Sequence, residues 1–262
     1  MTSQPSSSSA PPAPNFGRYA ERYAAFRPSY GADVYAVMEK RLSGPRAHAA
    51  DLGAGTGQVS ADLLTRFNRV TAVEPDAAMA ARIPPHDRLT VTVARAEDAD
   101  FPEGALDAVV AGTAFHWMDE SILCPKARTW LRPGGVFFVF TYRDLRAADD
   151  PGLNRFIAAE SAIWSSHRDK RLTEFVEYVD RIKATGAFAG AKRFDMVREW
   201  VMTPEALAGY FLTTSFASAH AEATGDEAAY AADFAARLRA ASKRKKIRVR
   251  YPLDGAIAWT GE

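Results

Sequence analysis

The sequence predicts an α/β fold in which a mostly parallel sheet of seven strands has helices on both faces. Five apolar segments between residues 47 and 140 are typical of buried strands, and segments with helical periodicity separate them. Strands that are apolar throughout need both faces of the sheet covered, which favours parallel pairing. A glycine-rich turn follows the first strand and an acidic residue ends the second, so we expect a ligand at the carboxyl edge of the sheet.

The composition limits the kind of protein. The chain has 262 residues, 47% of them hydrophobic, so one domain or one domain with an insertion is expected. The net charge of +1 implies neither a nucleic-acid partner nor an anionic membrane surface. No apolar run reaches about 18 residues, so no membrane-spanning helix is expected. The single cysteine, Cys124, rules out an intramolecular disulfide and fits a reducing compartment, so we expect a cytoplasmic protein.

The start of the chain divides into a tail and a helical segment. Residues 1–14 are rich in Ser, Pro and Ala, carry no charge and lack the basic start of a signal peptide, so we expect a disordered tail. Residues 15–45 mix aromatic residues with arginines, and Tyr19, Tyr23 and Arg27 share one helix face because they are spaced by four. Two interpretations are open for this segment: an amphipathic helix packed on the domain, or a lid over a ligand.

The later elements alternate along the chain. The expected strands lie at residues 47–52, 70–73, 89–93, 106–111, 136–140, 194–202 and 247–251. The expected helices lie at residues 33–42, 59–67, 77–83, 119–131, 154–164, 172–182, 204–212 and 226–238. After the last strand, Leu253-Asp254-Gly255 indicates a turn or a bulge.

The glycine-rich turn has chemical features of its own. Residues 51–57 read Asp-Leu-Gly-Ala-Gly-Thr-Gly between a strand and a helix. Glycine permits a positive φ and lets a ligand approach the backbone, and a helix N-terminus offers unpaired N–H groups. Glu74 ends the second strand 17 residues after Gly57, and an acid about 20 residues beyond such a loop commonly binds ribose hydroxyls. Together the two features predict a cofactor that contains a nucleoside.

Three motifs point to one family. The spacing G-x-G-x-G, with Asp51 just before it, resembles motif I of the class I S-adenosylmethionine (SAM)-dependent methyltransferases. The stretch Leu-Arg-Pro-Gly-Gly at residues 131–135, ahead of the apolar fifth strand, resembles the same family. The pattern from Phe16 to Tyr30 is similar to the start of a group that includes trans-aconitate methyltransferases. This resemblance covers residues 16–142 well, and it implies a Rossmann-like class I methyltransferase fold with SAM as cofactor and S-adenosylhomocysteine (SAH) as product.

The resemblance also implies which residues bind the cofactor. The N-terminal segment would cover the methionine end of SAM, and the acid after the third strand would face the adenine amino group. Glu97 matches that acid, with Asp98 as its rival and a solvated acidic turn as the alternative. The residues assigned to SAM on this basis are Tyr23, Arg27, Asp51, Gly53, Ala54, Gly55, Gly57, Glu74, Pro75, Ala96, Glu97 and Thr113.

Methyl transfer from SAM requires few chemical groups from the protein. Methyl transfer is an in-line displacement, so the enzyme mainly aligns the reactants and excludes water. A base is required where the nucleophile arrives protonated, and His116 after the fourth strand is the candidate catalytic residue because its unperturbed pKa is about 6.5. A structural hydrogen bond is the alternative role for His116. Trp117 and Trp164 are candidate substrate-binding residues, with burial in the core as the alternative.

The predicted function is methyl transfer to a small molecule, with a carboxylate or hydroxyl oxygen as the first choice of acceptor. We assign residues 46–142 to the SAM-binding core, 143–190 to a helical insertion over the substrate side, and 191–262 to the rest of the core sheet. An RNA or protein methyltransferase is a second hypothesis, and the basic run from Lys243 to Arg250 is its support, although cations also suit a helix C-terminus. A third hypothesis is a SAM-fold protein that uses the cofactor in a rearrangement or cyclisation. No Cys- or His-rich cluster predicts a metal.

Two truncations separate the tail from the helical segment. Removing residues 1–14 should leave activity intact, because that stretch has little apolar area to bury. Removing residues 1–30 should weaken SAM binding, because Tyr23 and Arg27 are lost. Calorimetry on both proteins measures the affinity, and equal affinities would reject the lid interpretation.

Overall fold

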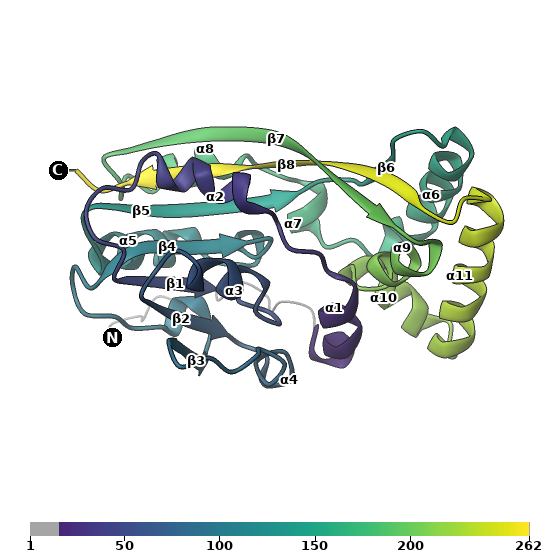
Figure 1. The fold of residues 1–262 in the computed structure, drawn as a ribbon, viewed down its shortest axis with the longest axis horizontal. Coiled ribbons are helices and arrows are strands. Elements are labelled where there is room, and N and C mark those ends of the chain that lie inside the picture. The colour runs from purple at the N-terminus through teal and green to yellow at the C-terminus, as the bar shows by residue number, and fades with distance from the viewer. Residues whose placement is uncertain (1–15, 262) are drawn as a thin grey trace, which may run out of the picture.

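The computed structural model describes residues 16–261, and within them the sheet has eight strands in the order β3-β2-β1-β4-β5-β8-β6, with β7 also paired to β8. The predicted tail, residues 1–14, lies outside the described residues. β1 to β5 pair in parallel, and β8 pairs antiparallel with β5, β6 and β7 (Figure 1). The strands are β1 (His48–Leu52), β2 (Arg69–Glu74), β3 (Leu89–Val93), β4 (Leu106–Gly112), β5 (Leu131–Tyr142), β6 (Arg146–Ala147), β7 (Gly190–Met202) and β8 (Ile247–Trp259). The predicted mostly parallel α/β sheet is confirmed, and β6 is a strand that the sequence did not indicate.

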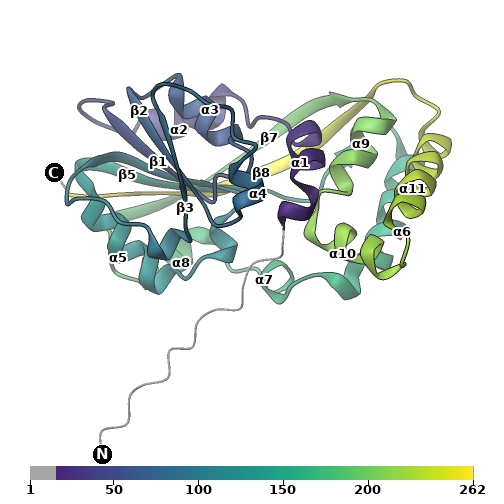
Figure 2. The ribbon, with the colours of Figure 1, turned by 90° about the horizontal axis from the view of Figure 1, so that it is seen from below.

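Helices cover both faces of the sheet. The α-helices of the described residues are α1 (Ala20–Phe26), α2 (Ala32–Glu39), α3 (Gln58–Leu64), α4 (Ala77–Ala80), α5 (Glu120–Trp130), α6 (Pro151–Trp164), α7 (Lys170–Thr173), α8 (Tyr178–Ala184), α9 (Pro204–Phe211), α10 (Ser215–Ala223) and α11 (Glu227–Ser242). Figure 2 shows α2 and α3 above the sheet, with α5 and α8 below it. Among the described residues no helix is long and apolar enough to cross a membrane.

The central strands are apolar because both of their faces are buried. Phe138 and Phe140 of β5 pack in the core with α2 and α3, while Phe137 and Val139 pack in the core with α5 and α8. Neighbouring residues of a strand point to opposite faces, so one apolar run supplies both cores.

The last strand is longer than the sequence indicated. The expected turn or bulge at Leu253-Asp254-Gly255 is wrong, because β8 continues through these residues to Trp259. Gly255 pairs with Phe140, and a Cβ there would lie 2.1 Å from the carbonyl oxygen of Val139. The glycine is therefore explained by a close approach between two strands and not by a change of chain direction.

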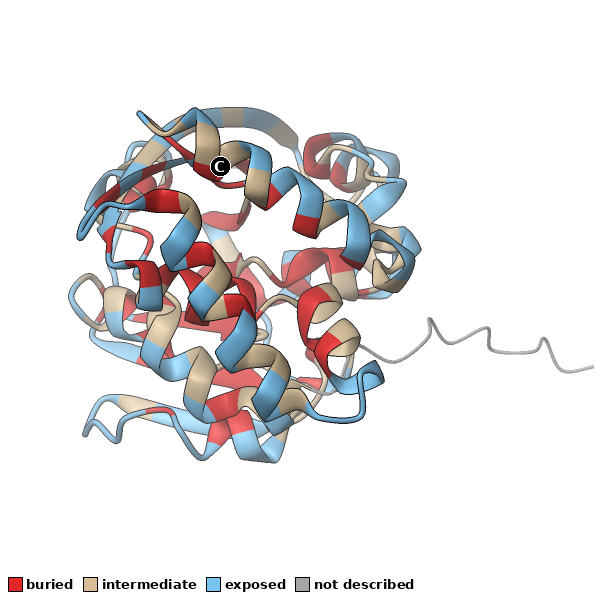
Figure 3. Cartoon of the chain, turned by 90° about the vertical axis from the view of Figure 1, so that its right-hand side faces the viewer, coloured by how far each residue is buried: buried red, intermediate tan, exposed pale blue. Residues whose placement is uncertain are grey.

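β7 and β8 extend beyond β5 into a separate group of helices. β5 pairs with residues 253–259 of β8, whereas β7 pairs with all of residues 247–259. Helices α6, α9, α10 and α11 gather at this far end, and we call them the cap (Figure 1). Figure 3 views the molecule from the cap end, with exposed residues facing outward and buried ones inward. The cap thus combines parts of the predicted 143–190 insertion and the predicted 191–262 segment, while α8 packs on the sheet.

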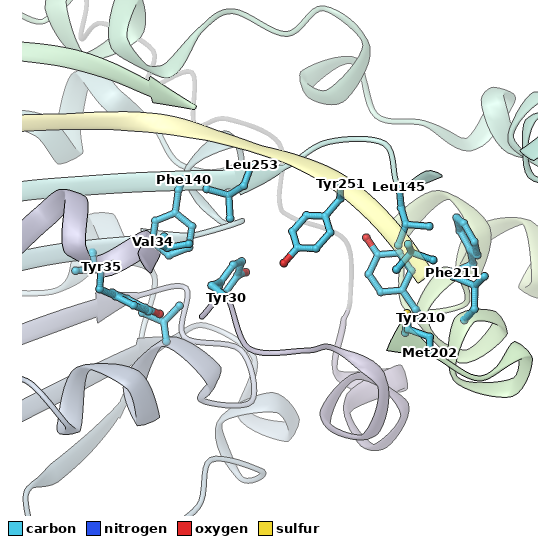
Figure 4. Packing of buried hydrophobic residues seen from close by; sticks show 14 of the residues in the cluster. Tyr30, Val34, Tyr35, Phe140, Leu145, Met202, Tyr210, Phe211, Tyr251 and Leu253 are labelled. Atoms are coloured by element: carbon cyan, nitrogen blue, oxygen red, sulfur yellow. The ribbon is translucent and has the colours of Figure 1, made fainter. Parts of the chain in front are cut away.

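An aromatic cluster joins the sheet to the cap. Tyr30 and Phe140 lie in the sheet core, Tyr251 is on β8, and Tyr210 and Phe211 come from α9 (Figure 4). All five side chains are buried in one cluster. Burial of aromatic area is the main source of stability at such a junction, so cap and sheet are held together by apolar packing.

The N-terminal segment crosses from the sheet to the cap. Gly17 N donates to Asp76 Oδ2 at 2.8 Å on the sheet side. On the cap side, Arg22 pairs with Glu227 at 3.1 Å and Tyr19 Oη donates to the Ser218 carbonyl at 3.4 Å. Figure 2 shows α1 between α4 and α9. The segment therefore contacts both halves of the molecule.

Candidate functional site

The glycine loop between β1 and α3 has the backbone that its sequence predicts. Gly53, Gly55 and Gly57 have φ values of +67°, +59° and +92°. A Cβ on Gly53 would lie 2.6 Å from Ala114 Cβ, and one on Gly57 would lie 2.9 Å from Ile83 Cγ2, so packing requires these two glycines. A Cβ on Gly55 would make only ordinary van der Waals contacts, with Met79 Cε at 3.6 Å and Tyr23 Cε1 at 3.7 Å, and Gly55 lines a cavity.

This cavity has a volume of about 360 Å³, and we call it the glycine-loop cavity. It lies at the carboxyl ends of β1, β2, β3 and β4, where ligands bind in open α/β sheets. Eight of the residues that the sequence assigned to the cofactor line it: Tyr23, Gly53, Gly55, Glu74, Pro75, Ala96, Glu97 and Thr113. Ala54 and Gly57 do not line it; Ala54 is buried and Gly57 caps α3, so both shape the loop.

Glu74 is fixed at the end of β2. Its Oε2 accepts from Gly55 N at 2.8 Å and its Oε1 accepts from Asp76 N at 3.0 Å. Burial raises the pKa of this carboxyl, while the two backbone N–H groups act in the opposite direction. Each carboxylate oxygen has a second lone pair, so Glu74 can still accept from hydroxyl groups in the cavity.

Asp51 lies behind the loop rather than along the cavity. Its side chain is fully buried, and its Oδ2 accepts from Ser60 Oγ at 2.6 Å. Oδ1 has no hydrogen-bond partner among the described residues. Burial raises the pKa of Asp51 to about 7. An unpaired buried carboxylate oxygen is costly, so this position is suited to a donor that the chain does not supply.

Of the two acids after β3, Glu97 faces the cavity. Its Oε1 accepts from Asp119 N at 2.8 Å, and its Oε2 lies 3.4 Å from Arg95 Nε. The rival, Asp98, is exposed and does not line the cavity. Glu97 therefore lies in the cavity after β3, where the sequence analysis expected the acid that faces the adenine amino group.

A second cavity of about 260 Å³ lies on the cap side of the first, and we call it the cap cavity. Phe16, Tyr23, Thr113 and Trp117 line both cavities, so they form a shared wall. Thr113 has a φ of +54°, which is uncommon for a residue with a branched Cβ. Tyr30 Oη donates to its hydroxyl at 2.8 Å and holds this conformation. Backbone strain of this kind concentrates at functional sites.

His116 lines the cap cavity in a neutral form. Burial, and then the positive charge of Arg181, lowers the pKa of His116 to about 3. Its Nδ1 lies 2.8 Å from Tyr178 Oη. The sequence argument for a base used the unperturbed pKa of His116, which takes no account of this burial.

Two more assignments differ from the sequence prediction. Arg27 lines the cap cavity and not the glycine-loop cavity, so it is placed away from the expected cofactor side. Trp164 lines neither cavity: it is fully buried, its Nε1 donates to Tyr230 Oη at 2.8 Å, and it packs on Phe234. Its assignment to the substrate is wrong because the cap helices enclose it. Trp117 does line the site, as predicted.

Sequence reasoning missed several residues of the cap cavity. Tyr142 and Arg143 end β5 and follow it, and Tyr210 comes from α9. Arg143 could have been found from the sequence, because it is a polar residue directly after an apolar strand. Glu74 was predicted from a similar position, at the end of the second strand. No comparable signal exists for Tyr210, because its position depends on how the cap packs.

Comparisons with known proteins agree with this geometry. Residues 50–139 match the methyltransferase domain family. A protein of Dictyostelium discoideum named as a methyltransferase is 28% identical over 127 residues, which are 48% of each chain. The trans-aconitate 2-methyltransferase of Deinococcus radiodurans is 32% identical over 128 residues, which are 45% of this chain and 47% of that one. The chain thus spans about half the length of these curated relatives.

A solved structure covers more of the molecule. A protein of Anaeromyxobacter dehalogenans that is named as a type II methyltransferase superposes with a TM-score of 0.70 and 28% identity, over 91% of this chain and 100% of that one. With the matched domain and the glycine-loop site, this shows a methyltransferase domain that has the fold of the class I SAM-dependent methyltransferases.

Replacing Gly55 by Val should abolish SAH binding while the protein stays folded, because the new side chain enters the glycine-loop cavity. Gly186→Val is the matched control: Gly186 has a similar φ of +64° and nothing within 4 Å of its Cβ position. Both variants place the same residue at a positive φ of similar size, so calorimetry compares their effects on the site. Equal SAH affinity in the two variants would place the cofactor elsewhere.

The low pKa of His116 predicts the shape of the pH–activity profile. The imidazole stays neutral as pH falls through its ordinary value and gains a proton near pH 3, so wild-type kcat should show no histidine limb near pH 6.5. His116→Gln should therefore keep the shape of the profile, and His86→Gln, at an exposed site, is the control. A wild-type limb near pH 6.5 that disappears in His116→Gln alone would show that the imidazole titrates normally.

Proposed function

We propose that this protein transfers a methyl group from SAM to a small molecule, with an oxygen of a carboxylate or hydroxyl group as the acceptor. The observation that carries the proposal is the wall shared by two cavities, one at the glycine loop and one under the cap. An in-line displacement requires the methyl donor and the acceptor to meet, and a wall shared by two cavities lets them do so.

The residues of the glycine-loop cavity fit the cofactor. Gly55 leaves the backbone open to a ligand, and Glu74 is oriented by two N–H groups with lone pairs left for ribose hydroxyls. SAM supplies a methyl group activated by a sulfonium. A fold neighbour from Haemonchus contortus, a phosphoethanolamine-type N-methyltransferase at 15% identity and a TM-score of 0.50, is described in complex with SAH.

The chain's own contribution to the reaction is alignment and exclusion of water. Phe16, Tyr23 and Trp117 give the shared wall an aromatic surface. The ring of Phe16 packs edge-on against Tyr23 and Trp117, with centroid distances of 6.4 and 6.1 Å. His116 is neutral and makes one hydrogen bond to Tyr178, so its Nε2 is available to hold a polar group of the substrate. We assign His116 a positioning role on this basis, because an imidazole with a pKa of about 3 is a weak base.

A carboxylate acceptor agrees with a weak base, since no proton has to leave. The name of the Deinococcus relative, a trans-aconitate 2-methyltransferase, supports an acidic substrate as well. The small volume of the cap cavity, about 260 Å³, favours a small molecule over a macromolecule.

The alternative functions have less support. The basic run that favoured an RNA or protein substrate is partly neutralised, because Arg248 pairs with the Asp149 carboxylate and Arg250 pairs with the Glu199 carboxylate. A rearrangement or cyclisation would leave the methyl group on SAM. The cytoplasmic location remains a prediction, in agreement with a buried free cysteine, Cys124.

Incubation with methyl-labelled SAM and a metabolite extract distinguishes these functions. We expect the label in a small molecule, detected by mass spectrometry, together with an equal amount of SAH. Gly55→Val in the same extract is the control and should give no labelled product. Label in RNA or protein would favour a macromolecular substrate, and a new product without label or SAH would favour a rearrangement.

A further inference from the structure

Arg27 occupies an unusual place in the cap cavity. It follows α1, and its Nε and Nη2 donate to the hydroxyl and carbonyl oxygens of Thr213 at 2.7 and 2.9 Å. Its guanidinium lies over the rings of Tyr23, Tyr142 and Tyr210, at 4.8, 5.3 and 5.1 Å from their centroids. The hydrogen bonds and the rings come from three parts of the fold, so the guanidinium is held in one orientation.

The charge of Arg27 is not balanced by the chain. The other two arginines that line the cap cavity have acidic partners: Arg143 bonds Asp254 at 2.9 and 2.8 Å, and Arg168 lies 3.6 Å from Asp144. Within residues 16–261, Arg27 makes no ion pair, and its Nη1 makes no hydrogen bond. A partly buried cation loses hydration, and neutral partners compensate for that loss less well than an anion does.

We propose that the cap cavity binds a substrate with two polar ends, in which Arg27 holds an anionic group and the methyl acceptor is a different atom at the shared wall. The inference rests on the proposed function and adds the class of substrate. It also reassigns Arg27, which the sequence assigned to SAM, to the substrate.

The position and the chemistry of Arg27 both favour an anchor over an acceptor site. Arg27 lines only the cap cavity and not the glycine-loop cavity, whereas methyl transfer takes place where the two cavities meet, at Thr113 and Trp117. An oxygen paired with a guanidinium is also a poorer nucleophile, because the ion pair stabilises its negative charge. The anchored anion thus orients the molecule, and the reacting atom lies at its other end.

The first test fractionates the metabolite extract on an anion exchanger before the labelling reaction. We expect the methyl acceptor in the retained, anionic fraction, and we expect its product to keep a negative charge, because the anchored group is not the one methylated. An acceptor in the unretained fraction, or a product that has lost all negative charge, overturns the inference but leaves the proposed function standing. Absence of labelled product from every fraction contradicts the proposed function itself.

The second test uses variants of Arg27 with the acceptor so isolated. Arg27→Gln should raise KM for the acceptor roughly 10- to 100-fold, the range for a hydrogen bond to a charged group, and leave the SAH affinity unchanged. Arg27→Lys keeps the charge and should recover part of the loss. Arg22→Gln is the matched control, because Arg22 lies on the same helix, pairs with Glu227 and does not line the cap cavity.

A neutral derivative of the acceptor makes the test specific. The wild-type protein should bind the amide of the anchored acid as weakly as Arg27→Gln binds the acid itself. The variant and the amide together should lose no more affinity than either change alone. Additive losses would show that Arg27 does not contact the anion. A loss of SAH affinity in Arg27→Gln, with KM for the acid unchanged, would return Arg27 to the cofactor.

Discussion

The hydrogen bond from Gly55 N to Glu74 Oε2, at 2.8 Å, ties the loop after β1 to the end of β2. It fixes the one glycine of the loop at which a Cβ would meet no close contact, and it orients the buried carboxylate of Glu74 toward the glycine-loop cavity. Parallel pairing of β1 with β2 brings these two residues to one edge of the sheet, with Leu52 opposite Val73. The glycine-loop cavity depends on this hydrogen bond, because the bond fixes both the Gly55 backbone and the Glu74 carboxylate that line the cavity.

The other half of the site depends on long-range packing. The cap is connected to the sheet by β7 and β8, which run past the end of β5, and by the aromatic cluster around Tyr251 and Tyr210. The N-terminal segment then bridges both parts, from Asp76 on the sheet side to Glu227 on the cap side. The cap cavity therefore exists only in the assembled molecule, while the glycine-loop cavity is formed by residues close to one sheet edge.

This difference explains what the sequence predicts well. The loop glycines, Glu74 and Glu97 were found because each follows a strand whose apolar pattern is local, and parallel strands bring such positions together. Trp164 was misplaced because its surroundings come from α9, α10 and α11, whose packing leaves no periodic signal for a pocket. The pKa of His116 was missed for the same reason, since burial is a tertiary property. In β8, Gly255 was taken for a turn because close strand contact and chain reversal both select glycine.

The central claim is that cofactor and substrate occupy two cavities that meet at Phe16, Tyr23, Thr113 and Trp117. A crystal structure of the SAH complex tests it most directly. We expect the ribose on Glu74 and the sulfur at the shared wall, with the cap cavity and Arg27 free of SAH. An SAH molecule that extends into the cap cavity, with its carboxylate on Arg27, would contradict the account.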